Sequence, residues 1–260
     1  MKKLVILLSL VFLVANVGPA SASSFFFDFN TGISSQWSGI TDLESVQGYA
    51  GLGSGSNVFS GNFLRNDTGG YGSTPASPVV PQTPTVLTLT GLPAHTSVSL
   101  SFLLAVIDSW DGKSNAKILR YPVGPDYFNV TVDGTNIFSQ TFSNFFGVSQ
   151  SYSGPKLGWG LSPRGFNPIW LDSAYDLGLD SVFQNIPHTG STLTVEWFAS
   201  GAGWQGDNLR FGGTQDESWA IDNVRVDLNG VHAPLPPTFA LLGSGLLGLG
   251  LVGVWRKKKA

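Results

Sequence analysis

The middle of the chain is built from short segments in which apolar and polar residues alternate. A period of two places alternate side chains on opposite faces of a strand, so each segment predicts a half-buried β-strand. Val, Thr and aromatic residues, which favour strands, are frequent in all of them. The segments are 86–92, 97–106, 127–134, 191–200 and 218–228.

The gaps between these segments are rich in Gly, Pro, Asn and Asp, which favour turns. Asp133-Gly134 predicts the tight turn of a hairpin. Many short strands separated by turns indicate an all-β fold. We therefore expect residues 23–231 to form a single antiparallel β-sandwich domain with a jelly-roll-like arrangement.

Three stretches lack this alternation. Residues 48–61 are rich in Gly and Ser, and residues 69–84 in Gly, Ser and Pro, so we expect both to be surface loops within the one domain. Residues 143–180 are aromatic-rich and irregular, and we expect a loop excursion over one face of the sandwich.

The N-terminal segment has the three parts of a secretory signal peptide. Met1-Lys2-Lys3 is followed by the apolar run LVILLSLVFLV and then by small residues. Ala20-Ser21-Ala22 matches an A-x-A cleavage site, so we expect residues 1–22 to be removed and the exported chain to begin at Ser23. The alternative is a buried N-terminal helix.

The C-terminal segment predicts a membrane-spanning helix. Residues 238–255 carry no charge, and as a helix they would be about 27 Å long, close to the thickness of a bilayer core. The basic tail that follows favours the cytoplasmic side, so the body would lie outside the inner membrane. The alternative is a plain tail anchor that is never processed. The tail is Arg256, Lys257, Lys258 and Lys259.

The whole segment 232–260 resembles the PEP-CTERM sorting signal of Gram-negative bacteria, which has a Pro motif, a Gly-rich apolar helix and a basic tip. The Pro motif here is Pro234, Leu235, Pro236 and Pro237. Leu235 stands where the commoner form has Glu, which leaves open which processing enzyme reads the signal. The resemblance implies cleavage by an exosortase-type membrane protease and transfer of the body from the inner membrane to the cell surface or extracellular matrix.

Composition excludes some kinds of chemistry. The chain has no cysteine, so thiol nucleophiles and cysteine-ligated zinc sites are ruled out. The formal net charge is -3, and the basic cluster lies at the tail, so nucleic acid is not an expected partner. No cofactor is certain from the residues.

A structural calcium ion is one hypothesis for the aspartates near the predicted strand ends. Carboxylate oxygens are the ligands that Ca²⁺ prefers, and the first and last strands of a jelly roll often run close together. The alternative is that each aspartate caps a turn or accepts hydrogen bonds from nearby backbone amides. The candidates are Asp28, Asp108, Asp111 and Asp222.

Polysaccharide binding is a second hypothesis, based on the many aromatic residues. Sugar rings stack on exposed aromatic side chains, and the segment 203–213 combines such a residue with polar ones. We expect Trp204 to be exposed there, whereas Trp197 and Trp219, which alternate within strands, are expected in the core. The candidate contacts are Trp204, Gln205, Asp207 and Asn208.

Two segments are similar to strands of known secreted sandwich proteins. Residues 92–112 and 216–226 resemble strands in bodies that precede this sorting signal. The segment ESWAIDNVRV also resembles the last strand of jelly-roll modules such as MAM-like and carbohydrate-binding domains. The resemblance supports the fold.

Catalysis is not expected. None of the three histidines, His95, His188 and His232, has the spacing of a metal site, and Glu196 has no evident carboxylate partner for glycoside hydrolysis. We therefore expect an exported, non-catalytic surface or matrix protein that contacts extracellular polysaccharide. The alternatives are a secreted glycan hydrolase and a purely structural surface protein without a ligand.

Overall fold

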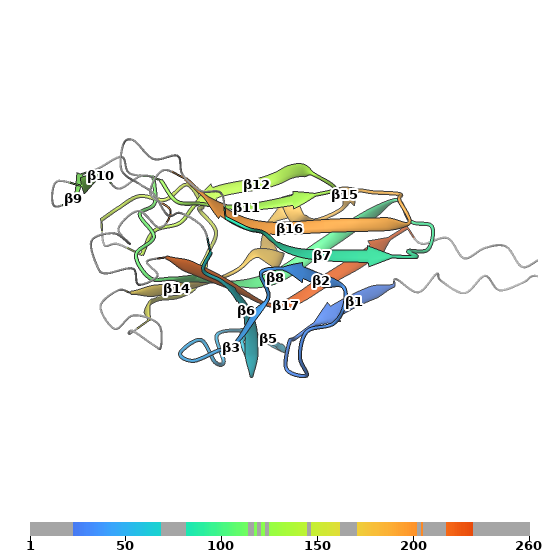
Figure 1. Cartoon of the computed structure of the whole chain (residues 1–260), viewed down its shortest axis with the longest axis horizontal. Coiled ribbons are helices and arrows are strands. Elements are labelled where there is room, and N and C mark those ends of the chain that lie inside the picture. The colour runs from blue at the N-terminus through green and yellow to red at the C-terminus, as the bar shows by residue number, and fades with distance from the viewer. Residues whose placement is uncertain are drawn as a thin grey trace, which may run out of the picture. The chain divides into compact units, whose positions relative to one another are not determined.

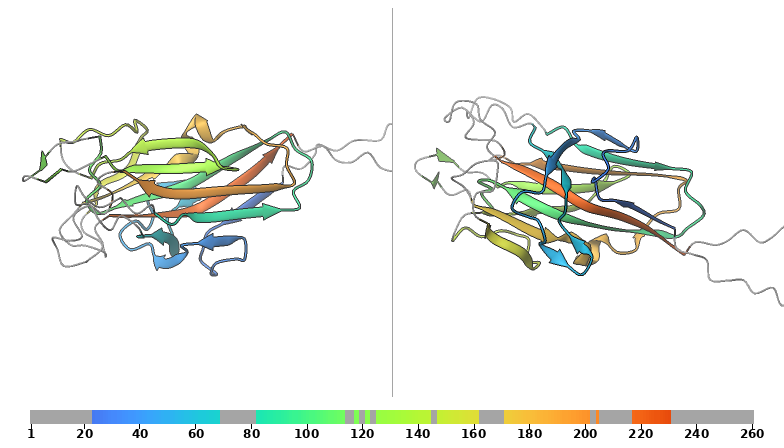
Figure 2. Two further views of the ribbon diagram at one scale, coloured as in Figure 1. Left: turned by 45° about the horizontal axis from the view of Figure 1, so that its top comes forward. Right: turned by 90° about the horizontal axis from the view of Figure 1, so that it is seen from below.

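The computed structural model describes residues 23–68, 82–113, 117–118, 121–122, 125–144, 147–161, 171–201, 204 and 217–230. Residues 22–231 form one compact unit. Within the described residues, two antiparallel sheets face each other, as Figures 1 and 2 show, so the predicted all-β sandwich is confirmed.

The larger sheet has eight strands among the described residues. Its path runs through β13 (Lys156–Leu161), β14 (Asp172–Asp176), β8 (Ser97–Ile107), β17 (Ser218–Asn229), β6 (Asn62–Asn66) and β3 (Asp42–Ser45). Beside this path, β1 (Ser24–Phe27) pairs with β17, and β15 (Ile186–Pro187) pairs with β8. Two single-turn 3₁₀ helices, η1 (Leu177–Leu179) and η2 (Ser181–Phe183), connect β14 to β15.

The smaller sheet has five strands among the described residues. Their order is β12 (Thr135–Thr141), β11 (Tyr127–Val132), β16 (Thr192–Ser200), β7 (Thr85–Thr90) and β2 (Trp37–Gly39). Two short ribbons lie outside the sheets: β4 (Gly53–Ser54) with β5 (Asn57–Val58), and β9 (Lys117–Ile118) with β10 (Tyr121–Pro122).

The strands predicted by alternation are all present, as β7, β8, β11, β16 and β17. The predicted hairpin turn joins β11 to β12. Asp133 and Gly134 both have positive φ, 49° and 76°, which a two-residue type I′ turn requires. Aspartate tolerates this conformation better than most residues, so the Asp-Gly pair fixes the register of the hairpin.

The main core lies between the two sheets. Leu100, Phe102 and Leu104 of β8 point toward the smaller sheet, where Trp197 of β16 is fully buried. The ring of Phe102 meets that of Trp197 edge-on, with centroids 5.9 Å apart. Trp219 of β17 is also in this core, so the prediction that Trp197 and Trp219 are core residues is confirmed.

A second core covers the outer face of the larger sheet. The second half of β8 is apolar at every position, and Leu103, Ala105 and Ile107 are buried on that outer face. Tyr49 and Phe59 pack with them and are themselves fully buried, with ring centroids 5.5 Å apart. The prediction that residues 48–61 form a surface loop holds for most of the segment, which is exposed or half-buried, but it missed the short strands β4 and β5 and the two buried rings. Tyr49 and Phe59 supply apolar side chains that the sheet needs on its second face.

The region 143–180 also differs from the prediction, because it contains two strands of the larger sheet. β14 lies between β13 and β8, and all five of its residues are buried. Its sequence, DSAYD, is polar and does not alternate. Apart from Tyr175, small side chains and hydrogen-bonded carboxylates occupy the buried positions, so hydropathy does not reveal the strand.

A β-bulge divides β17 into two halves. The register with β8 shifts between Asp222 and Arg225, and Asn223 has a positive φ of 51°. On its other edge, the first half of β17 pairs with β6 and the second half pairs with β1. The bulge is therefore the point at which β17 exchanges one neighbour for another.

The two ends of the sandwich differ in the length of their connections. At one end, which we call the loop end, β8 finishes at Ile107 opposite the start of β17 at Ser218. The connections at this end run through 67–84, 108–126, 142–155, 162–171 and 201–217.

We call the opposite end the terminus end. There β17 finishes at Asn229, opposite the start of β8 at Ser97. The chain also enters here, because Ser24 pairs with Asp227. The connections at this end, 91–96, 133–134 and 188–191, are short.

In the part of the chain that the structure describes, no helix has the length and apolar character needed to cross a bilayer. The predicted spanning segment 238–255, the signal peptide 1–22 and the Pro motif 234–237 all lie outside the described residues.

The second core gives a test of the role of residues 48–61. We predict that Phe59→Ala lowers the free energy of unfolding by about 3–5 kcal/mol, because it leaves a cavity against β8. Phe26→Ala is the matched control, since Phe26 is 56% exposed and its loss changes stability by about 0.5 kcal/mol or less. Urea unfolding measures both. Equal small losses for the two variants would show that residues 48–61 do not contribute a core.

Candidate functional site

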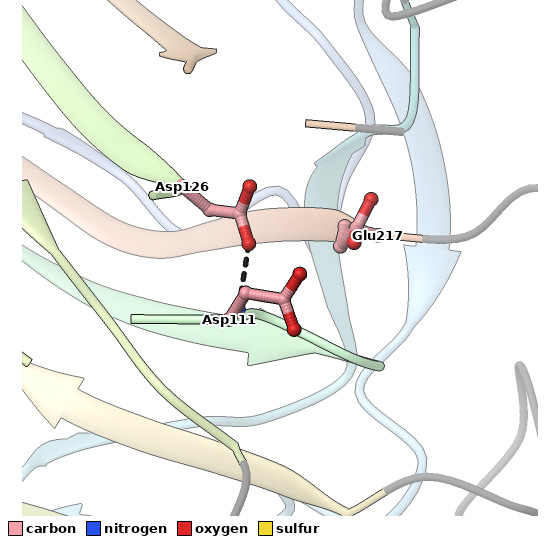
Figure 3. Close-up of side chains that lie close together, drawn as sticks. All are labelled: Asp111, Asp126 and Glu217. Atoms are coloured by element: carbon pink, nitrogen blue, oxygen red, sulfur yellow. Dashed lines mark hydrogen bonds between the residues drawn. The ribbon is translucent and has the colours of Figure 1, made fainter. Parts of the chain in front are cut away.

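Three buried carboxylates meet at the loop end of the sandwich. Asp111 follows the end of β8, Asp126 directly precedes β11, and Glu217 directly precedes β17. Because neighbouring strands are antiparallel, the end of one strand and the starts of the next lie at the same end of the fold. Figure 3 shows the three side chains close together.

The cluster is compact and shielded. One ligand oxygen from each of Asp111, Asp126 and Glu217 lies within 4.8 Å of the others, and all three residues are buried. The Asp111 backbone N–H donates to Asp126 Oδ2 at 2.6 Å, which fixes the segment after β8 relative to the start of β11. Ser109 Oγ lies 3.5 Å from Glu217 Oε1.

Arg65 brings a positive charge to the start of β17. Its Nε donates to Ser218 Oγ at 3.1 Å, and its Nη1 pairs with Glu44 Oε1 at 3.1 Å. Glu44 therefore neutralises part of the charge that Arg65 carries to this end of the sheet.

The chemistry of the cluster suits a hard divalent cation. Buried carboxylates in close proximity repel one another, and a cation among them removes that repulsion. Calcium binds oxygens at about 2.4 Å, so ligands on opposite sides of the ion are about 4.8 Å apart. Asp111, Asp126 and Glu217 fit within that limit, and carbonyl or water oxygens would complete a shell of six to eight ligands.

The four aspartates predicted as calcium ligands do not come together. Asp111 belongs to the cluster just described. Asp108 lies at the end of β8, where its backbone N–H donates to Asp172 Oδ1 at 3.0 Å. Asp28 and Asp222 lie at the bulge of β17, beside the end of β1. Among the described residues, Asp111 is the one of the four that belongs to a cluster able to hold a metal ion, and its partners there are Asp126 and Glu217. The hypothesis that some of the four share one ion stays a prediction.

Asp28 and Asp222 follow the alternative, in which aspartates bind backbone amides. Asp28 Oδ1 accepts from the Asn30 N–H at 3.2 Å. Asp222 Oδ1 accepts from the Asn223 N–H at 2.7 Å, and its Oδ2 accepts from the Ser60 N–H at 3.2 Å. Burial raises the pKa of Asp222 to about 7, and the nearby charge of Asp28 adds to that rise. Asp222 thus fastens segment 58–60 to the bulge.

Asp172 shares its buried environment with a tyrosine. Burial raises the pKa of the Asp172 carboxyl, against the effect of the hydrogen bond from the Asp108 backbone. Burial also raises the pKa of Tyr49 well above its usual value, and the charge of Asp172 adds to this. Both groups therefore favour their neutral forms more than they would in water.

The prediction that Trp204 is exposed is wrong. Its side chain is 1% exposed and meets Trp110 edge-on, with ring centroids 5.2 Å apart. Trp204 Nε1 donates to the Thr68 carbonyl at 3.3 Å, so this residue ties the β16–β17 connection to the β6–β7 connection. The other candidate contacts in its segment, Gln205, Asp207 and Asn208, lie outside the described residues.

Trp159 is the large aromatic residue that the described structure leaves accessible near the loop end. It is 42% exposed on β13, an edge strand of the larger sheet. Lys156 Nζ lies 5.4 Å from the centroid of its ring. Trp110 and Tyr152, by contrast, are buried.

Sequence reasoning missed Asp126 and Glu217, although a signal was present. Each directly precedes a strand that alternation predicts, and Asp111 follows the end of another. Carboxylates at strand starts and strand ends of an antiparallel sandwich share one end of the fold. Hydrophobic spacing cannot show which of them converge, because the sheet order decides that.

No family model matches the sequence, and no curated protein matches it.

Among solved structures, the K1 cleaved adhesin domain of Lys-gingipain from Porphyromonas gingivalis W83 is 13% identical, with a TM-score of 0.38, covering 80% of this chain and 99% of that one. The CBM22-1 xylan-binding domain of Xyn10C from Paenibacillus barcinonensis is 12% identical, with a TM-score of 0.28, covering 81% and 95%.

The carboxylate cluster predicts calcium-dependent stability. We expect calcium, added after chelation to 100 times its dissociation constant, to raise the free energy of unfolding by about 2.7 kcal/mol. The melting temperature of the full-length chain in mild detergent would then rise by about 5–10 °C. Glu217→Gln should reduce this response because it removes one ligand charge.

Asp133→Asn is the matched control for the calcium experiment, since Asp133 lies in the β11–β12 turn at the terminus end. This variant should keep the full response. The same melting temperature in calcium and in chelator, for the unmodified chain, would mean that the three carboxylates hold no cation.

Proposed function

We propose that this protein is an exported, non-catalytic protein of the cell surface or extracellular matrix. In this proposal, residues 238–255 hold it in the inner membrane until an exosortase-type protease cuts near Pro234–Pro237. The observation that carries the proposal is that the two ends of the sandwich differ. The chain enters and leaves at the terminus end, and the long connections are at the loop end.

This difference between the two ends suits a protein that is held at a membrane by its terminus end and faces outward with its loop end. The segment that follows Gly230 leads to the Pro motif and the apolar run, so a tether there would act at the terminus end. The loop end, with its carboxylate cluster, is the part of the sandwich most distant along β17 from that tether. In many proteins a rigid scaffold positions loops, and the loops carry the binding residues.

The burial and the hydrogen bonds of the carboxylates support a non-catalytic role. Asp111, Asp126 and Glu217 are buried, so a glycosidic bond does not reach them in this conformation. Glu196 accepts a hydrogen bond from Thr131 Oγ1 of the neighbouring strand at 2.9 Å, which is a role within the sheet. These contacts favour a structural and binding role over hydrolysis.

The ligand class that we propose is extracellular polysaccharide. Trp159 offers an exposed aromatic face of the kind on which sugar rings stack, and Lys156 beside it supplies a hydrogen-bond donor. Gln205, Asp207 and Asn208 of the β16–β17 connection carry amide and carboxylate groups of the kind that bind sugar hydroxyls.

The sorting part of the proposal is tested by the intact mass and location of the native protein in its own host. We expect a chain that begins near Ser23, ends near residues 234–238 and fractionates outside the inner membrane. A chain that keeps residues 238–260 and stays in the inner membrane would replace the proposal with that of a permanent tail-anchored protein.

The binding part is tested by a pull-down on insoluble matrix polysaccharides, with reducing-sugar release measured on the same polymers. We expect retention without sugar release, and a loss of at least about tenfold in affinity for Trp159→Ala, since a stacking contact of this kind contributes at least about 1.4 kcal/mol. Leu179→Ala is the control, because Leu179 is also exposed but is not aromatic. Sugar release would indicate a hydrolase, and no retention on any polymer would indicate a structural protein without a glycan ligand.

A further inference from the structure

Two histidines that are far apart in the sequence meet at the terminus end. His95 lies in the β7–β8 connection, and His188 lies in the β15–β16 connection. Both side chains are buried. His95 Nε2 lies 2.6 Å from His188 Nδ1. The two rings are within 17° of parallel with centroids 4.9 Å apart, so they meet edge to edge through these nitrogens.

The two outer ring nitrogens face hydrogen-bond acceptors. His95 Nδ1 lies 2.6 Å from the carbonyl oxygen of Pro93. His188 Nε2 lies 3.0 Å from the carbonyl oxygen of Thr192 and 3.2 Å from Asp133 Oδ2. A carbonyl oxygen cannot donate a hydrogen bond, so these two contacts are hydrogen bonds only when each outer nitrogen carries a proton.

Counting protons then fixes the charge of the pair. The two outer nitrogens need one proton each, and the contact between the inner nitrogens needs one more to be a hydrogen bond. Two neutral imidazoles carry two protons in total, so three protons make one positive charge. We infer that His95 and His188 form a proton-binding site that holds one shared proton and fastens the terminus end of the sandwich.

Asp133 provides the balancing negative charge. Its Oδ2 faces His188, and its Oδ1 accepts from the Thr194 N–H at 2.9 Å, which holds the carboxylate in place. The side chain is 45% exposed, so water screens part of the attraction. Farther along β17, Arg225 and Asp227 bind each other at 2.9 Å, and so their charges largely cancel.

The proton site is connected to the point where the chain leaves the sandwich. Thr96, next to His95, donates from its backbone N–H to the Asn229 carbonyl at 3.0 Å. The His188 backbone N–H donates to the Thr96 carbonyl at 3.4 Å. The histidine pair therefore joins the connections that hold the last residue of β17, directly before the segment that leads to the Pro motif.

Nitrogen-15 NMR of the full-length chain in mild detergent, with labelled histidine, tests the proton count directly. At pH 7 we expect His95 Nδ1 and His188 Nε2 at the chemical shift of protonated nitrogen. We expect the two inner nitrogens at intermediate shifts, with a scalar coupling between them. His95→Gln and His188→Gln assign the signals. One outer nitrogen without a proton, as in two neutral rings, would overturn the inference.

Asp133→Asn tests the charge balance without disturbing the turn, because Asn also favours positive φ. In the same nitrogen-15 spectra we expect the His188 signals to change in this variant, since the negative charge beside His188 Nε2 is gone. Asp42→Asn is the matched control: Asp42 is exposed on β3, opposite Arg65 near the loop end, and its variant should give the spectrum of the unmodified chain. Identical histidine spectra of all three chains would contradict the role of Asp133.

Discussion

The pairing of β8 with β17 is the interaction on which the rest of this structure depends. The two strands are hydrogen-bonded along almost their whole length in the middle of the larger sheet. One face of the pair forms the main core with Trp197 and its neighbours, and the other face is covered by Tyr49 and Phe59. The ends of the same pair carry Asp111 and Glu217 at the loop end and Thr96 and Asn229 at the terminus end.

The bulge in β17 lets this strand pair with two different neighbours along the edge that faces away from β8. Before the bulge β17 pairs with β6, and after it with β1. Asp222 and Asn223 at the bulge hold segment 58–60 through the Ser60 N–H and the Val58 carbonyl. Local irregularity in the last strand is thus what positions both the first strand and the segment that covers the outer face of the sheet.

The fold was largely predictable from the sequence because alternation and turn residues are local signals. Alternation identified the central strands, and Asp133-Gly134 identified a hairpin. β14 was not predicted, because a strand buried on both faces with small and polar residues has no alternation. At the candidate site only Asp111 was predicted. The convergence of Asp126 and Glu217, and of His95 with His188, depends on sheet order, which no local pattern encodes.

The direction in which β17 leaves the sandwich has a mechanical consequence. If the chain is held at its C-terminal side while a partner pulls on the loop end, the force acts along β17. The hydrogen bonds between β17 and β8 lie across that direction, so they share the load and must break together, not one by one. The Leu228 N–H also donates a hydrogen bond to the Ser23 carbonyl, so β1 shares the load with β17 and β8. A sandwich tethered in this way resists extension through its most extensively paired strand.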